Sequence, residues 1–303
     1  MSNHEDAPQE VRDLAEERAR ARAERDFARA DALRDRIAEL GYRVVDGPEG
    51  TALEPAQAEA PRRRPAREVP SVLAEPATAD VSLHWVVEGW PEDVARAVAS
   101  FRRVEDGRDV QYVVADATET DPAAYGEDVE VIALEDGTGW AAASNAGLRR
   151  SRGRVAVALD GSVEATGDVF GPLEAALGDP TVGVCGPFGI STEDLRDFHE
   201  SPGPEVDAVE GYLMAFRREV LAETATFDER FRWYRIADIE LCFRLKDAGY
   251  RALVVDLPVT RHEHRMWNTT PPEERERLSK RNFNTFLERF RGRSDLLVAN
   301  RRT

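Results

Sequence analysis

Apolar and polar positions alternate along the chain with two periods, and the change of period predicts where elements begin and end. Beyond residue 80, short apolar runs of strand type are separated by stretches whose apolar residues recur every three or four positions. The predicted strands are residues 81–87, 110–115, 129–134, 155–159 and 182–184, and the predicted helices are residues 91–101, 141–150 and 169–177. This alternation is typical of an α/β domain with a mostly parallel sheet.

The first 80 residues have a different pattern. Residues 11–40 predict a helical hairpin, because Phe27, Ala30, Leu33 and Ile37 fall on one helix face. Two short extended pieces follow within residues 42–53. Proline and alanine dominate from there to residue 80, a composition that favours a linker. We therefore expect three parts: a helical hairpin module at 1–54, a linker at 55–80, and an α/β domain at 81–303.

Composition narrows the class of protein. The chain has 303 residues, of which 42% are apolar, so it can bury a sizeable core. Its formal net charge is −17, with the acids concentrated in the middle of the chain, and this argues against nonspecific binding along a polyanion. The sequence shows no signal peptide, no membrane-spanning run and only two cysteines, so a cytoplasmic protein is expected.

Acidic residues follow three of the predicted strands. Glu88, Asp116 and Asp160 each stand at a strand's carboxyl end. Open α/β sheets bind ligands outside these ends. A single acid there is often only a helix cap, whereas three in one sheet indicate a candidate binding site.

Three stretches carry a resemblance to family 2-type glycosyltransferases, which have the GT-A fold of nucleotide-diphospho-sugar transferases. The first, "GTGWAAASNAGLRRSRGRVAVALDGS" at 137–162, has the family's Ala-x-Asn-x-Gly helix and then a strand that ends near the metal-binding Asp-x-Asp position. The second runs over 209–255, with "FDERF" and "ADIEL" where the family has its acceptor-side motifs. The third, "RHEHR" at 261–265, follows a strand where the family often has a metal-binding histidine. The resemblance spans roughly 81–291.

The resemblance implies a role for several residues. Asp238 falls on the catalytic base, which takes the acceptor's hydroxyl proton in a transfer expected to invert the anomeric centre. The implied donor-binding residues are Glu88, Asp116, Asn145 and Asp160. The implied acceptor-side residues are Glu210, Trp233 and Glu240. The implied partners are a nucleotide-sugar donor and a glycan, lipid-linked or protein acceptor. A buried asparagine that ties a helix to a loop is an equal explanation for Asn145, and a core position is the more frequent one for Trp233.

The metal site departs from the family pattern. The resemblance implies a divalent cation, Mg²⁺ or Mn²⁺, held by Asp160 and by His262, with His264 as an alternative. Ser162, however, stands where the second acid of Asp-x-Asp would be, and a hydroxyl is a poor ligand for a hard cation. Three outcomes stay open: a cation held by the other residues, transfer without a metal, or a noncatalytic GT-A domain that binds a nucleotide or a protein partner. Activity as an enzyme is favoured over the last of these.

Residues 26–51, "DFARADALRDRIAELGYRVVDGPEGT", resemble the C-terminal end of cysteinyl-tRNA synthetases. The chemistry of the synthetase is absent, because the sequence has neither its zinc cysteines nor its nucleotide-binding motifs. We favour an interaction or dimerisation module over tRNA binding. At the other end, residues 273–293 predict an amphipathic helix. Docking onto the sheet is the preferred interpretation, and peripheral attachment to the inner face of a membrane is the alternative.

Overall fold

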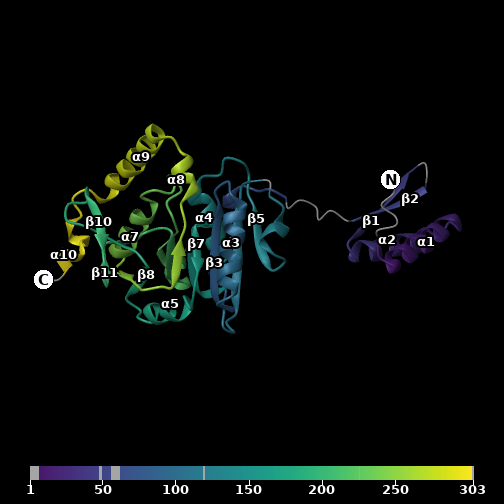
Figure 1. The fold of residues 1–303 in the computed structure, drawn as a ribbon, viewed down its shortest axis with the longest axis horizontal. Helices are drawn as coiled ribbons and strands as arrows, with labels where there is room; N and C mark the ends of the chain where they lie inside the picture. Colours follow the sequence, from purple (N-terminus) through teal and green to yellow (C-terminus); the bar gives the residue numbers. More distant parts are fainter. Residues whose placement is uncertain (1–6, 48–49, 56–61, 119, 225, 302–303) are drawn as a thin grey trace. The chain divides into compact units, whose positions relative to one another are not determined.

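The computed structural model describes residues 7–47, 50–55, 62–118, 120–224 and 226–301, and its chain divides into two compact units (Figure 1). The first unit is Met1–Arg62 and the second is Arg63–Thr303. Each unit has its own hydrophobic core.

The small unit is a helical hairpin followed by a two-stranded antiparallel sheet. Its elements are α1 (Gln9–Ala23), α2 (Phe27–Glu39), β1 (Tyr42–Gly47) and β2 (Gly50–Pro55). Asp26 begins α2, since its Oδ1 accepts a hydrogen bond from the backbone N–H of Arg29 (3.1 Å). Ile37 and Leu53 are fully buried in the core between helices and sheet. The predicted hairpin and extended pieces are therefore present.

An eight-stranded sheet forms the centre of the large unit, in the order β11-β14-β8-β13-β6-β3-β4-β5. Its strands are β3 (Ala79–Val87), β4 (Val110–Asp116), β5 (Val129–Ala133), β6 (Gly153–Leu159), β8 (Val182–Gly186), β11 (Glu205–Val206), β13 (Leu213–Arg217) and β14 (Arg251–Val254). Strands β3, β4, β5 and β6 pair in parallel, as do β8 and β14, whereas β13 and β11 run antiparallel to their neighbours. The expectation of a mostly parallel sheet is confirmed.

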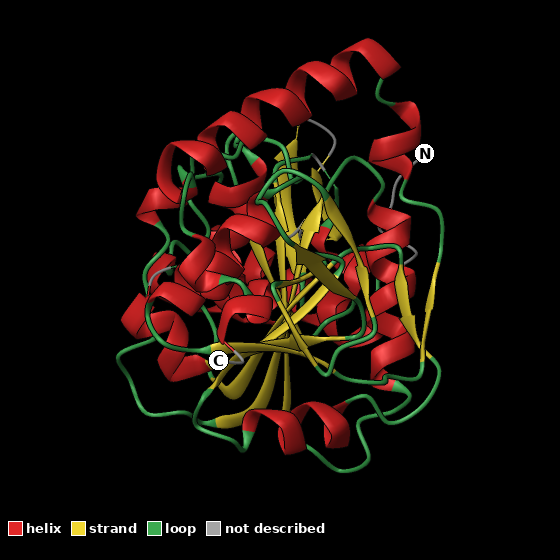
Figure 2. Cartoon of the chain, turned by 90° about the vertical axis from the view of Figure 1, so that its left-hand side faces the viewer, coloured by secondary structure: helices red, strands yellow, loops and turns green. Residues whose placement is uncertain are grey.

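Helices cover both faces of this sheet (Figure 2). One face packs against α3 (Pro91–Arg102) and α5 (Phe170–Leu177), and the other against α4 (Trp140–Leu148), α6 (Arg218–Thr224) and α7 (Ala237–Asp247). Helix α9 (Pro272–Phe290) packs on α7, with Phe286 and Phe290 against Phe243 at ring-centroid distances of 5.2 and 5.5 Å. This contact accounts for the apolar face of the predicted C-terminal helix. No helix in the described ranges is both long and apolar enough to span a membrane.

The remaining elements are short. They are β7 (Val163–Ala165), β9 (Gly189–Thr192), β10 (Phe198–Ser201), β12 (Ala208–Val209), β15 (Val259–Arg261), α8 (Arg265–Thr269), α10 (Val298–Arg301), η1 (Ala66–Glu68), η2 (Pro122–Tyr125) and η3 (Ser294–Leu296). Strands β10, β9 and β12 form a three-stranded sheet, and β15 pairs with β7.

The structure corrects the expected extent of the linker. Residues 56–61 lie outside the described residues, but residues 63–78 pack on the large unit. Arg64 forms a parallel bridge with Leu134, and Val69 is 5% exposed. The guanidinium of Arg218 donates to the carbonyls of Val72 and Glu75. Proline-rich composition predicted a solvated segment because it disfavours helices and strands, yet an extended chain can still satisfy its carbonyls from neighbouring arginines.

Candidate active site

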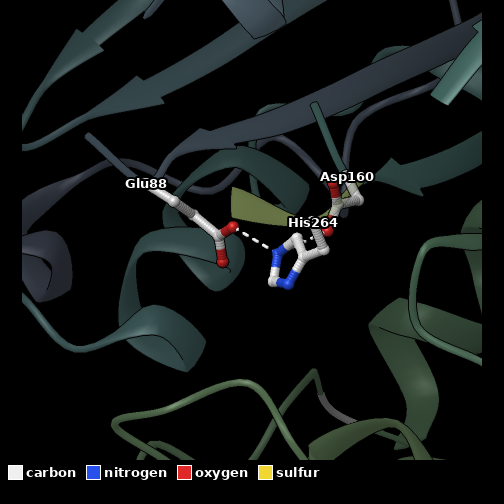
Figure 3. Close-up of side chains that lie close together, drawn as sticks. All are labelled: Glu88, Asp160 and His264. Atoms are coloured by element: carbon white, nitrogen blue, oxygen red, sulfur yellow. Dashed lines mark hydrogen bonds and ion pairs between the residues drawn. The ribbon is translucent and has the colours of Figure 1, made fainter. Parts of the chain in front are cut away.

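Two of the strand-end acids meet because their strands are adjacent. Glu88 follows β3 and Asp160 follows β6, and these strands pair in parallel up to Trp85 opposite Leu159. His264 reaches the same place from the segment after β15. Its Nε2 lies 2.7 Å from Glu88 Oε2 and 2.9 Å from Asp160 Oδ2 (Figure 3). One ligand atom from each of the three side chains lies within 4.8 Å of the others, so the cluster could hold a metal ion.

The imidazole of His264 and the two carboxylates shift one another's pKa values. Burial acts to lower the pKa of His264, but its hydrogen bonds to Asp160 and Glu88 outweigh that effect and raise the pKa to about 10. Burial acts to raise the pKa of Asp160, but the bond and charge of His264 bring the net shift downward. Burial raises the pKa of Glu88. An imidazolium therefore occupies the cluster at neutral pH when no other cation does.

Asp238 lies in the first turn of α7, on the acceptor-side half of the domain. Its Oδ2 accepts from the backbone N–H of Gly211 (2.8 Å) and its Oδ1 from that of Ile239 (2.9 Å). The residue before α7, Ile236, is left-handed (φ 72°) and forms the sharp turn into the helix. Burial raises the pKa of Asp238 to about 6, although both backbone bonds act in the opposite direction. A carboxyl with this pKa is ionised at neutral pH and can accept a proton near it.

One cavity of about 830 Å³ joins the two halves of the site. Its wall includes Glu88 and Asp160 from the strand ends, Glu210 and Asp238 from the acceptor half, and Phe283 of α9. The volume lies in the range of ligand sites in proteins. The side chain of residue 238 thus lies on the same side of the sheet as the strand-end acids.

Several predicted site residues lie elsewhere. Asp116 is 2% exposed and accepts hydrogen bonds from the hydroxyls of Thr118 (2.6 Å) and Tyr125 (2.9 Å), so its carboxylate is already engaged. Asn145 Nδ2 and Oδ1 bond the carbonyl and the N–H of Phe227, both at 2.8 Å. It ties α4 to the loop before α7, which is the structural alternative for this residue.

Two acceptor-side predictions differ from the structure in the same way. Glu240 is 1% exposed and its two oxygens each lie 2.9 Å from Arg244 Nε, so it points into the protein rather than into the cavity. Trp233 is buried and stacks on Trp267 with ring centroids 6.0 Å apart. Neither residue lines the cavity. Their positions in the acceptor-side motif predicted nearness to the site, but Asp238 and Glu240 are two residues apart on α7, about half a helical turn, so their side chains point in nearly opposite directions.

The structure also changes the metal-site expectation. His262 is not in the cluster, because its Nε2 lies 2.7 Å from Glu164 and the side chain is 44% exposed. His264, two residues on, takes the place beside Asp160. Ser162 donates its backbone N–H to Asp160 Oδ1 (2.6 Å), while its buried Oγ has no hydrogen-bond partner among the described residues.

Sequence reasoning missed some residues that shape the site. Tyr234, which follows Trp233 in the sequence, lies with its hydroxyl 3.1 Å from His264 Nδ1 and so orients the imidazole. Arg261 pairs with Glu210 (3.1 Å) and its guanidinium stacks over Tyr212. Lys280 and Phe283 enter the cavity wall from α9. The amphipathic pattern of α9 indicated its buried face, but no sequence signal indicated that its edge faces the site.

Both units resemble known proteins. The model of the family described as Glycosyl transferase family 2 matches residues 91–239. Among solved structures, a mannosyltransferase (PcManGT) from Pyrobaculum calidifontis, in complex with GDP-Man and Mn²⁺, aligns with a TM-score of 0.53 and 19% identity over 73% of this chain and 71% of that chain. GalNAc-T7 with UDP, GalNAc and Mn²⁺ aligns with a TM-score of 0.55 and 16% identity over 69% of this chain and 48% of that one. At these identities the likeness shows the fold, which is GT-A-like.

The small unit has relatives of its own. The model described as Cysteinyl-tRNA ligase anticodon binding domain matches residues 4–51. Cysteine--tRNA ligase 1 of Burkholderia lata is 54% identical over 48 residues, which are 16% of this chain and 10% of that protein. The cysteine--tRNA ligase of Nitratidesulfovibrio vulgaris is 56% identical over 43 residues, which are 14% of this chain and 9% of that protein. The chain thus spans about a tenth of the length of these curated relatives. Both resemblances seen in the sequence are confirmed: residues 91–239 match Glycosyl transferase family 2 within a GT-A-like fold, and residues 4–51 match the anticodon binding domain of cysteinyl-tRNA ligases.

Proposed function

We propose that the large unit transfers a sugar from a nucleoside-diphosphate donor to an acceptor hydroxyl with inversion at the anomeric carbon. The observation that carries this proposal is that Asp238, in the first turn of α7, and the strand-end acids Glu88 and Asp160 line one cavity. The family match over residues 91–239 supports glycosyl transfer in general. The solved neighbours were bound to GDP-Man or to UDP, which supports a nucleotide-sugar donor.

In this proposal Asp238 is the general base. Its carboxylate accepts the proton of the acceptor hydroxyl while that oxygen forms a bond to the anomeric carbon. The bond from the anomeric carbon to the diphosphate breaks at the same time, and the nucleoside diphosphate leaves with the electron pair. The N–H groups of Gly211 and Ile239 fix the carboxylate in position. Attack from the face opposite the diphosphate inverts the anomeric centre.

A divalent cation fits the strand-end cluster. Carboxylate and imidazole are suitable ligands for Mn²⁺, and carboxylate oxygen suits Mg²⁺. Asp160 and His264 would hold it, with Tyr234 orienting the imidazole through Nδ1. When bound, such a cation neutralises the charge that develops on the leaving diphosphate. Both structural neighbours were solved with Mn²⁺.

Direct binding and turnover measurements test the proposal. The full chain is titrated with UDP- and GDP-sugars by calorimetry, with and without Mn²⁺, and sugar-nucleotide hydrolysis is followed over hours. We expect binding of one donor class, and slow hydrolysis that is lost in Asp238→Asn. Asp247→Asn is the matched control, because Asp247 lies at the other end of α7 and pairs with Arg293 on the surface. Absence of affinity for any nucleotide, with or without metal, would refute transfer and favour the noncatalytic alternative.

For the small unit we propose an interaction or dimerisation module. Its match covers only the anticodon binding domain of a ligase, and the described residues of this chain carry none of the ligase's catalytic motifs. Many of its surface carboxylates are paired with arginines, as Glu17 is with Arg29 (2.5 Å). The mixed charge of this surface favours a protein partner over a polyanion.

A further inference from the structure

The Asp-x-Asp position of this chain lacks one carboxylate, and the structure shows what surrounds the gap. Ser162 is 4% exposed and stands where the second acid of the motif would be. A small cavity of about 20 Å³ adjoins it, and Glu88, Asp160 and His264 are also in its wall. A cavity of this size holds about one water molecule or ion. The buried hydroxyl of Ser162 makes no hydrogen bond of normal geometry among the described residues, although its nearness to Asp160 helps to lower the pKa of that carboxyl.

Glu88 brings a carboxylate to this place from another strand. It is the first residue after β3, and β3 lies next to β6 in the sheet, so Glu88 and Asp160 emerge side by side. The side chains of Glu88, Asp160 and His264 are 14%, 15% and 10% exposed. Two partly buried carboxylates that meet at one imidazole nitrogen repel each other, and a cation beside them offsets this repulsion. Glu88 and Asp160 also line the large cavity, so a cation held by them would face the donor.

We propose that Glu88, which follows β3, is a ligand of the divalent cation. Its carboxylate takes the place of the second acid of Asp-x-Asp, where this chain has Ser162. The protein ligands are then Glu88, Asp160 and His264. This inference rests on the proposed function for the use of the cation, but the binding of the metal is measured independently of transfer.

The test removes the carboxylate of residue 88 and introduces one at residue 162. Mn²⁺ binding to the full chain is measured from the loss of the free-ion electron paramagnetic resonance signal, for wild type, Glu88→Gln, Ser162→Asp and the double variant. We expect Glu88→Gln to weaken Mn²⁺ binding by about tenfold or more, as loss of a site partner does. Ser162→Asp in the Glu88→Gln background is expected to restore the affinity, because it returns the missing carboxylate to the same cavity.

Two histidines provide the control pair. His264→Ala is expected to lose Mn²⁺ binding, whereas His262→Ala keeps it, because His262 pairs with Glu164 outside the cluster. Melting without metal shows whether each variant is folded. If Glu88→Gln is not, Glu88→Asp replaces it, since the shorter carboxylate is expected to bind Mn²⁺ more weakly than wild type.

Wild-type affinity in Glu88→Gln, or in Glu88→Asp, overturns the proposal, and so does a wild-type chain that binds no Mn²⁺. That last result leaves the transferase proposal standing if the donor still binds without metal, so the two failures are distinguishable. A folded double variant that binds no better than Glu88→Gln also overturns the exchange of Glu88 for the Asp-x-Asp acid.

Discussion

Ionisation of Asp238 is expected to raise activity and to lower the stability of the folded protein. The Asp238→Asn variant tests both effects. Burial raises the pKa of Asp238 from 3.8 to about 6. The carboxylate needed as a base is therefore about one-tenth populated at pH 5 and about nine-tenths populated at pH 7. We expect kcat/KM of the wild type to rise about tenfold between these pH values. Asp238→Asn is expected to lower kcat by about 10²–10⁴-fold at pH 7, the usual contribution of a general base.

The stability effect follows from the same shift. A raised folded-state pKa means that the ionised carboxylate is disfavoured in the folded protein, so the cost is absent below the unfolded pKa and complete above pH 6. A shift of roughly two pH units corresponds to about 3 kcal/mol. The amide of Asn accepts only one of the two backbone bonds from Gly211 and Ile239, and the lost bond offsets about 1 kcal/mol. Asp238→Asn is therefore expected to be more stable than wild type by about 2 kcal/mol at pH 8.

Urea unfolding at pH 4.5 and pH 8, beside steady-state kinetics from pH 5 to 8, measures both effects. The stability advantage of Asp238→Asn is expected to grow from the lower pH to the higher, while its activity stays low throughout. Asp247→Asn, on the exposed end of the same helix, serves as the control for helix stability. A flat kcat/KM profile between pH 5 and 7 would refute the assignment of this pKa to the base. A pH-independent stability difference would show that burial of Asp238 does not perturb its ionisation.

Three further outcomes are expected. Gly211→Ala places a methyl 3.1 Å from the Asp238 side chain and is expected to displace the base. We expect a lower kcat and little change in the donor Kd measured by calorimetry. A kcat equal to that of wild type would contradict this effect of the close approach. Asn145→Ala leaves the backbone N–H and carbonyl of Phe227 buried without their partner, and is expected to cost about 1–3 kcal/mol in urea unfolding. The donor affinity of the folded variant is expected to match that of wild type. A selective loss of donor binding would indicate that Asn145 contacts the donor. The full chain is expected to shift tRNA no further in a gel than a chain lacking residues 1–62, and retardation that depends on those residues would overturn the interaction-module proposal.

Most of the fold follows from local patterns in the sequence. The strand–helix alternation of 81–184 depends on side chains only a few residues apart, and the structure has these elements at nearly the predicted bounds. Strand β13 did not emerge from the pattern. Its run Leu213–Arg217 is short and apolar, and its place between β6 and β8, antiparallel to both, depends on partners distant in the sequence. Residues 63–78 were assigned to a linker for the same reason, since the carbonyls there are satisfied by an arginine far along the chain.

The site illustrates the limit of motif reasoning at the level of single side chains. A motif fixes the position of a backbone segment, and in the structure both Asp160 and Asp238 line the cavity. The direction of a side chain depends on neighbours that the motif does not include. His262 and His264 have nearly the same sequence context, and residues two apart in an extended segment point to the same side. Their side chains nevertheless have different partners, because β15 ends at Arg261 and the chain then turns into α8. After this turn His264 contacts Asp160, whereas His262 contacts Glu164. The identity of the cluster thus depends on where one short strand stops, which a period of two in the sequence cannot specify.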